Sequence, residues 1–161
     1  MIAGIDVNSK NIVIAFKRDE KVKFIRIKRY YDNEAKHSIL ERLIENGIDE
    51  VAIENPEIIR KYIEESKFKN REEKRFAINL VSFLEELKSF LEFAKIKVIL
   101  VDPENTSNVC PYCHEKIYYE DVDLGIVFDY HTVYCPRCNK NFDRDEVASL
   151  NILNRAIEVV A

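Results

Sequence analysis

The chain has 161 residues, of which 47% are hydrophobic and 34% are charged, and its formal net charge at pH 7 is −4. This length predicts one compact domain, or one domain that carries a small module. The apolar content predicts a packed core and excludes a disordered chain. The acidic balance argues against a protein that holds nucleic acid mainly through phosphates, because such proteins are usually basic.

The amino-acid sequence also bears on location. It contains no apolar run long enough to cross a bilayer, and its start, MIAGIDVNSK, has no secretory signal. We therefore expect a cytoplasmic protein with no membrane partner.

The first third of the chain is rich in β-forming residues. Residues 1–29 are expected to form three strands, because MIAGIDV, NIVIAF and KVKFIRIKR are β-rich runs separated by short polar turns. Residues 33–46 have helical periodicity, and Gly47 is a fitting stop. The segment DEVAIE, residues 49–54, is a short strand. The apolar face of the helix is expected to comprise Ile39, Leu40, Leu43 and Ile44.

The rest of the chain adds helices and one further strand. Residues 57–94 are expected to form two helices broken near Asn70, and the run IKVILVD at 96–102 suits a buried parallel strand. A helix follows from about 144 to 158. The order β-β-β-α-β-α-α-β predicts an α/β fold with a mixed five-stranded sheet flanked by helices. The buried stripes are expected to comprise Phe76, Leu80, Phe83, Leu84, Leu87 and Leu91, then Leu150, Leu153, Ile157 and Val160.

Positive charge is concentrated in one segment. Between Lys17 and Tyr31, seven lysines and arginines accompany two acids. Two interpretations remain open. The segment is either a strip that faces phosphates or a set of cations that guards a sheet edge.

Four cysteines form two matched pairs with 21 residues between the pairs. Two such knuckles supply the four thiolates of a tetrahedral zinc site. Disulfides are disfavoured in a cytosolic chain, and a redox-active CPYC motif needs a single pair at a helix start after an early strand. Because four cysteines fill every position on the metal, the zinc is expected to be structural. The predicted ligands are Cys110, Cys113, Cys135 and Cys138.

The histidines and the segment between the cysteine pairs carry weaker signals. His114 follows a cysteine, but we expect it to be solvated, and His37 and His131 have no partner pattern. The segment between the pairs is rich in tyrosines and acids. Tyrosines can stack on bases, but neighbouring acids repel phosphates, so we expect a hairpin that buries its own aromatic residues.

Two strands each end in a small residue followed by a carboxylate. Gly4 and Asp6 lie on one face of their strand, and Ala52 and Glu54 lie on one face of theirs. If the two strands are parallel neighbours, both acids project at the carboxyl edge of the sheet, where open α/β sheets place ligands. Taken singly, each acid is an ordinary strand-end residue; the repeated pattern favours a functional site.

Three further acids lie at the start of the last helix. Asp143 and Glu146 fit a capping box, so the local pattern explains Asp143 as the N-cap. Asp145 lies in the first turn, where the helix dipole also favours an acid. Together with Asp6 and Glu54, Asp145 is predicted to bind a pair of Mg²⁺ or Mn²⁺ ions, which prefer oxygen ligands.

These motifs resemble a known family. GIDVN at 4–8, VAIEN at 51–55 and the run VDPENTSNVCPYC…YCPRCNKNFDRDEVASLNIL are similar to the RuvC-like nuclease domain of the TnpB (OrfB) proteins. The resemblance implies an RNase H-like core over residues 1–104, an inserted zinc ribbon over 105–142 and a final helix over 143–161.

The resemblance also implies site residues. It makes Asp6, Glu54 and Asp145 the catalytic carboxylates and leaves Asp143 without a catalytic role. Departures from the family pattern are Asn8, where glycine is usual, Val147, where asparagine is usual, and Ser149, where alanine is usual.

The implied activity is a Mg²⁺- or Mn²⁺-dependent endonuclease that cleaves DNA, single-stranded or branched DNA included. Only 47 residues separate Asp6 from Glu54, and the family's N-terminal guide-binding region is not in this sequence, so RNA guidance is not carried over from the family and the use of a guide RNA is left open. Two alternatives stay open: a catalytically idle relative that binds nucleic acid or protein, and a dimeric Holliday-junction resolvase. The oligomeric state is left open.

Overall fold

The computed structural model describes most of the chain. The described residues are 1–8, 10–29, 31–65, 70–104, 106, 108–119 and 132–160. His131 and most of the hairpin predicted between the cysteine pairs lie outside them. Among the described helices, none combines the length and the apolar character needed to cross a membrane.

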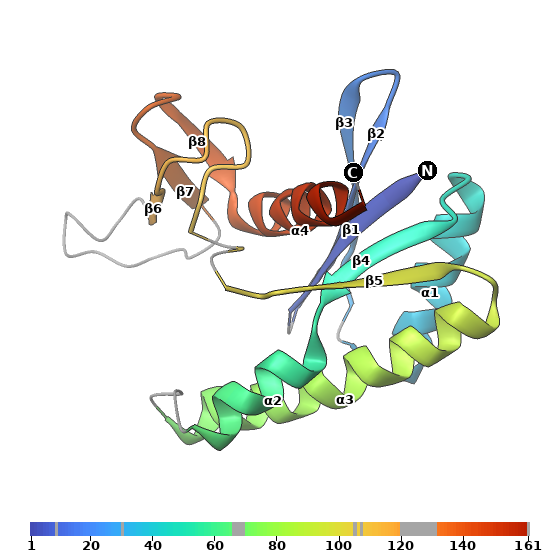
Figure 1. The fold of residues 1–161 in the computed structure, drawn as a ribbon. Coiled ribbons are helices and arrows are strands. Elements are labelled where there is room, and N and C mark those ends of the chain that lie inside the picture. Colours follow the sequence, from blue (N-terminus) through green and yellow to red (C-terminus); the bar gives the residue numbers. More distant parts are fainter. Residues whose placement is uncertain are drawn as a thin grey trace.

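A mixed five-stranded sheet forms the centre of the molecule, in the order β3-β2-β1-β4-β5 (Figure 1). The antiparallel meander pairs β1 with β2 and β2 with β3, while β4 runs parallel to β1 and β5 runs parallel to β4. The predicted α/β fold is confirmed. The strands are β1 (Ile2–Val7), β2 (Ile12–Arg18), β3 (Lys21–Ile27), β4 (Glu50–Glu54) and β5 (Lys97–Val101).

Four helices in the described part of the chain cover the sheet, and each begins at a polar cap. The helices are α1 (Asn33–Glu45), α2 (Pro56–Glu64), α3 (Arg71–Phe93) and α4 (Arg144–Val160). Asp32, Asn55 and Asn70 accept backbone N–H groups of the first turns of α1, α2 and α3. The predicted helix break near Asn70 is confirmed, and this residue caps α3 by accepting from the N–H of Glu73 at 2.8 Å.

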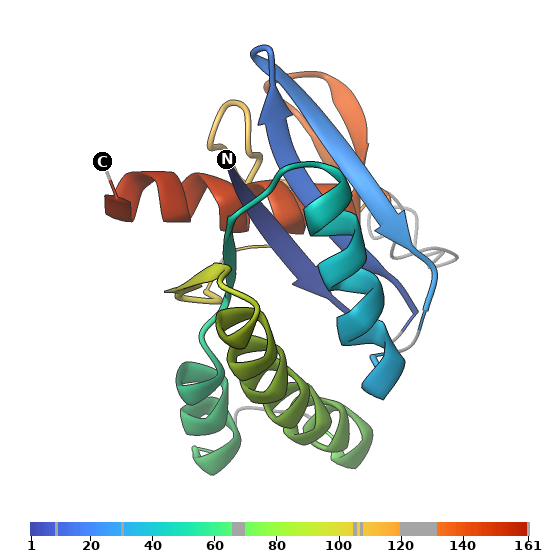
Figure 2. The same ribbon diagram turned by 90° about the vertical axis from the view of Figure 1, so that its right-hand side faces the viewer.

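The two faces of the sheet have separate hydrophobic cores. Helices α2 and α3 lie on one side of β4 and β5, and α4 crosses the other side (Figures 1 and 2). The larger core joins β1, β2 and β4 to α1 and α3 through residues such as Ile5, Ile39 and Leu87. The face that carries Gly4, Asp6, Ala52 and Glu54 is the one that α4 covers.

One predicted core position is wrong. Ile44, assigned to the apolar face of α1, is 65% exposed. The buried stripe of this helix is Ala35, Ile39 and Leu43, and Leu40 is only partly buried. Ile44 lies about 100° around the helix from Leu43, because an α-helix turns once in 3.6 residues, so it faces solvent.

A small three-stranded sheet leads into α4. It comprises β6 (Tyr118–Tyr119), β7 (Thr132–Cys135) and β8 (Lys140–Asp143). Strand β8 ends at Asp143 and α4 begins at the next residue. The cysteine-bearing segment is therefore connected directly to the first residue of α4.

The basic segment lies at an edge of the main sheet. Strand β3 is the outermost strand on its side, and the lysines on β3 are exposed. This position agrees with cations that guard a sheet edge. Arg26 is different, because its side chain reaches the acids at the start of α4.

Candidate functional site

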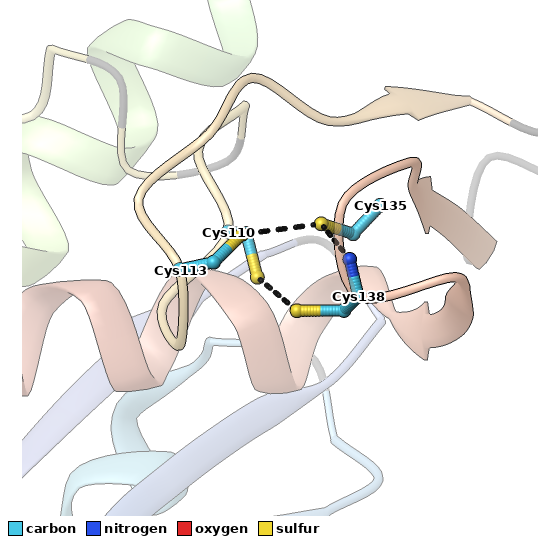
Figure 3. A group of neighbouring side chains, drawn as sticks. All are labelled: Cys110, Cys113, Cys135 and Cys138. Carbon is cyan, nitrogen blue, oxygen red and sulfur yellow. Dashed lines mark hydrogen bonds between the residues drawn. The ribbon is translucent and has the colours of Figure 1, made fainter.

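The four cysteines converge from two loops into one cluster (Figure 3). Their Sγ atoms all lie within 4.8 Å of one another. The Sγ–Sγ distances are 3.9 Å for Cys110 and Cys138 and 3.4 Å for Cys113 and Cys135. Four sulfurs about 2.3 Å from a central zinc would lie about 3.8 Å apart in a tetrahedron. The donor type and the spacing both fit zinc.

The thiols of this cluster strongly influence one another. Burial opposes ionisation of Cys135, but the backbone N–H of Cys138 and the neighbouring thiols lower the pKa of Cys135 to about 7. The thiol of Cys113 and burial raise the pKa of Cys138. Because zinc binds thiolates, its binding releases these protons. The exposed side chain of His114 agrees with the prediction that it is solvated.

The zinc ribbon is attached to α4 by polar and apolar contacts. The Asn151 side chain donates to the carbonyl oxygens of Thr106 at 2.8 Å and Val109 at 2.7 Å. Val147 is 2% exposed and packs among the ribbon residues Cys110 and Ile117. Its departure from the family pattern therefore has a structural explanation: the side chain belongs to the core of the ribbon.

Asp6 and Glu54 lie at the carboxyl ends of neighbouring parallel strands. The β1–β4 ladder ends at the pair Gly4–Ala52, and the same register places Asp6 opposite Glu54 two residues further on. Asp6 is 2% exposed and Glu54 is partly buried. Their charges interact, since Asp6 contributes to the raised pKa of Glu54.

Asp145 joins Asp6 through Asn8. The Asn8 side-chain amide donates to Asp145 Oδ1 at 2.9 Å and reaches Asp6 Oδ2 at 3.5 Å. Asp143 accepts from the backbone N–H groups of Asp145 at 2.9 Å and Glu146 at 3.0 Å, which confirms its predicted role as the N-cap. This cap orients the first turn of α4 so that the Asp145 side chain, 2% exposed, lies beside Asp6.

Two arginines, which were not predicted as site residues, neutralise these acids. Arg144 Nη1 lies 3.1 Å from Asp145 Oδ1 and 3.6 Å from Asp6 Oδ2. Arg26 contacts Asp145 Oδ2 at 3.1 Å and Asp143 Oδ1 at 2.8 Å. The predicted meander could have identified Arg26 as a residue near the site. Its strand register places Asp6, Val13 and Arg26 side by side.

Burial disfavours the charged forms of Asp6 and Glu54. Burial, followed by the charge of Asp145, raises the pKa of Asp6 to about 6 although Arg144 opposes the shift. Burial and the charge of Asp6 raise the pKa of Glu54 to about 8. Such carboxylates gain from a nearby cation, and their hard oxygen atoms suit Mg²⁺ or Mn²⁺.

The carboxylates are less tightly grouped than the thiols. Among the described residues, only the four cysteines form a group of three or more metal-ligand side chains with all donor atoms within 4.8 Å. Arg144 bridges Asp6 and Asp145 in this arrangement. The structure therefore brings the three predicted acids to one edge of the sheet, with an arginine among them.

Comparisons with known proteins agree with this architecture. Residues 82–152 match the family model described as Cas12f1-like, TNB domain. The fold is similar to a chain in the cryo-EM structure of the Cas12f1-sgRNA-target DNA complex, with a TM-score of 0.64, 20% sequence identity, and coverage of 96% of this chain and 50% of that chain. The present chain thus spans about half the length of that Cas12f1 chain.

Other comparisons add little. A chain from the crystal structure of Fowlpox virus resolvase and substrate Holliday junction DNA complex aligns with a TM-score of 0.36 and 19% identity over 65% of this chain and 62% of that chain, too low to indicate a common fold. No curated protein matches the sequence. The family-model match and the Cas12f1 fold agree with the predicted resemblance: residues 82–152 match the TNB domain model, the α/β fold is similar to that of the Cas12f1 chain, and the four clustered cysteines suit a zinc ribbon.

Proposed function

We propose that this protein is a divalent-metal-dependent endonuclease that hydrolyses DNA phosphodiester bonds through Asp6, Glu54 and Asp145. The observation that carries the proposal is the convergence of these acids from β1, β4 and the start of α4. Two of them are nearly inaccessible to solvent. Buried acids in each other's field are costly to a fold, which favours a role that compensates the cost with a cation.

The proposed ligands are the oxygens of these three side chains, because Mg²⁺ and Mn²⁺ prefer carboxylate oxygen. A bound pair of such ions would activate water and stabilise the leaving oxygen of a phosphodiester. Glu54 must lose its proton to act as a ligand. The Asn8 amide holds Asp145 beside Asp6.

The zinc ribbon has a supporting role in this proposal. Four thiolates fill a tetrahedral site, so the zinc keeps no position for water or substrate. What the ribbon contributes is placement, since β8 ends at Asp143 and α4 starts with Arg144 and Asp145. Zinc thus holds the helix that carries the third acid.

DNA is the proposed substrate. The chain in the similar structure was solved in a complex with target DNA. In the present protein, exposed Lys17, Lys21 and Lys23 lie on the hairpin whose Arg26 reaches the acids. Of these lysines, Lys17 lies on the same face of the sheet as Arg26 and Asp6, and it is available to contact a phosphate on that side, whereas Lys21 and Lys23 lie on the opposite face. Guide RNA is not part of the proposal.

Cleavage of labelled single-stranded and branched DNA in Mn²⁺ or Mg²⁺ tests this function. Asp6→Asn, Glu54→Gln and Asp145→Asn should each lower the cleavage rate by at least about a hundredfold, because each removes a charged ligand. Asp143→Asn is the matched control: asparagine is also a good N-cap, so activity should largely remain. Cleavage that persists in folded Asp6→Asn and Glu54→Gln proteins would refute the proposal.

A second function is favoured by one specific observation. Arg26 and Arg144 already pair with Asp145, as expected for a relative that binds nucleic acid without cutting it. That protein would bind DNA equally well with and without Mn²⁺ and would not cleave it. Calorimetric titration with Mn²⁺ separates the two functions, since only the nuclease should bind the ion through Glu54.

A further inference from the structure

The three acids differ in how many partners they have. Within the described residues, the Asp145 side chain has three partners: Arg26 contacts Oδ2, and both Asn8 and Arg144 contact Oδ1. The Asp6 side chain has two longer contacts there, 3.5 Å to Asn8 and 3.6 Å to Arg144. The Glu54 side chain has no hydrogen bond or ion pair within the part of the chain that the structure describes. Because a carboxylate can accept about four hydrogen bonds, Asp6 and Glu54 have more acceptor capacity left for a metal ion than Asp145 has.

The two arginines are held in different ways. Arg26 projects from the C-terminal end of β3, beside Val13 and Asp6 in the sheet register, and it bridges the two acids Asp143 and Asp145. It is a structural link between β3 and the start of α4. Its contacts use Asp145 Oδ2 and leave Oδ1 to other groups.

Arg144 is the first residue of α4, and its contacts include Asp145 Oδ1 and Asp6 Oδ2. The N-terminus of a helix carries partial positive charge, which disfavours an arginine there unless acids offset it. The side chain is 27% exposed, so solvent is within its reach. An arginine keeps its charge at all accessible pH values, so it must move if another cation is to take its place.

We propose that Arg144 is an internal counter-cation that competes with a divalent metal ion for Asp6 and Asp145. The inference rests on the proposed function, since it concerns the same acids. In this account Arg26 remains bound to Asp145 Oδ2, and Arg144 withdraws to release Asp145 Oδ1 and Asp6 Oδ2. The first ion to bind uses Asp6 and Glu54, and Asp145 becomes a ligand when Arg144 leaves.

Mn²⁺ affinity of the zinc-loaded protein, measured by calorimetry or by electron paramagnetic resonance, tests the role of Arg144 without any activity assay. Arg144→Gln should raise the affinity by about tenfold or more, because it removes a competing charge in direct contact with two ligands. Arg26→Gln should not raise it comparably, because Asp145 loses its fixed orientation. Arg137→Gln removes the same charge from a side chain that is 67% exposed on the ribbon and should change nothing.

The outcomes separate this inference from the proposed function. If Glu54→Gln weakens Mn²⁺ binding but Arg144→Gln leaves it unchanged, the counter-cation role is refuted and the metal site stands. If Arg26→Gln raises affinity as much as Arg144→Gln, a general charge effect replaces the specific role. If neither the wild type nor Arg144→Gln binds Mn²⁺, both ideas fail. Should Arg144→Gln not fold, Arg144→Lys, which keeps the charge without the forked contacts, should give a smaller increase.

Discussion

At the scale of single residues, three acids of similar chemistry have different environments. Asp145 is surrounded by donors, Asp6 is buried with two long contacts, and Glu54 is partly buried beside Asp6. The difference follows from position: Asp145 lies in a helix first turn within reach of two arginines, whereas Glu54 ends a strand. The pKa of Glu54, about 8, is therefore higher than that of Asp6, about 6.

This difference predicts how stability depends on pH. The pKa of Glu54 is raised from 4.5 to about 8 by burial and by Asp6. Between these values the folded protein keeps a proton that the unfolded chain releases, so the free energy of unfolding falls as pH rises and levels off above about 8. Between pH 6 and pH 8 the free energy of unfolding of the wild-type protein should fall by roughly 2 kcal/mol, since one pKa unit corresponds to about 1.4 kcal/mol. This fall should be absent in Glu54→Gln.

Urea unfolding of the zinc-loaded protein, without other divalent ions, measures this dependence. Glu50→Gln, at the opposite end of β4 and 39% exposed, is the matched control and should keep the wild-type slope. Equal slopes in wild type and Glu54→Gln would show that Glu54 does not titrate in this range.

At the scale of elements, the site depends on how closely α4 approaches β1. A Cβ on Gly4 would lie 2.5 Å from the Leu153 nitrogen and 2.9 Å from its Cα, and would also meet the Ser149 carbonyl oxygen. Only a residue without a side chain allows the backbones of strand and helix to touch. Gly4 precedes Asp6 on the same face, so this contact also sets the distance from α4 to that acid.

Gly4→Ala should therefore affect stability and metal binding together. Overpacking against the backbone should cost about 1 to 3 kcal/mol, and displacement of α4 should weaken Mn²⁺ binding. Gly47→Ala is a useful control, because Gly47 has φ +67° and no atom within 4 Å of an added Cβ. It should lower stability by about 1 kcal/mol through backbone strain and leave Mn²⁺ affinity unchanged. Calorimetry and thermal melts distinguish the two effects, and a Gly4→Ala protein with wild-type Mn²⁺ affinity would contradict this account.

The elements themselves were predictable because their signals are local. Alternation marks β1 and β4 and places Asp6 on the face of Gly4 and Glu54 on the face of Ala52, and the structure shows that α4 covers this face. The arginine contacts were not predictable in the same way, since Arg26 meets Asp145 only after the meander forms and α4 crosses it. Val147 appeared in the sequence as a departure from a motif, and only packing shows that it fills the ribbon core.

At the scale of the whole molecule, the predicted zinc site and the acids are connected through α4. The ribbon contacts α4 through Asn151 and Val147, and β8 passes directly into the cap at Asp143. The start of α4 therefore has two supports, the sheet below it and the ribbon beside it. Loss of either should displace Asp145.

Removal of zinc should unfold the ribbon and the start of α4 before the sheet. Structural zinc stabilises isolated fingers by on the order of 10 kcal/mol, so a chelator should lower the melting temperature strongly. Hydrogen exchange followed by mass spectrometry should show lost protection at 132–148 first, and later loss in β1 and β2. Zinc should restore the protection, and Mg²⁺ alone should not. A melting temperature unchanged by the chelator would contradict this prediction.

The central claim, that Asp6, Glu54 and Asp145 form one cation-binding centre, is tested most directly by a crystal of the zinc-loaded protein soaked in Mn²⁺. Anomalous scattering distinguishes the two metals. The account predicts zinc among the four cysteines and a manganese peak in contact with Asp6 and Glu54, with the Arg144 side chain moved away from Asp145. The claim would be contradicted if zinc occupied the cysteine site but no manganese bound at the acids and Arg144 still bridged Asp6 and Asp145.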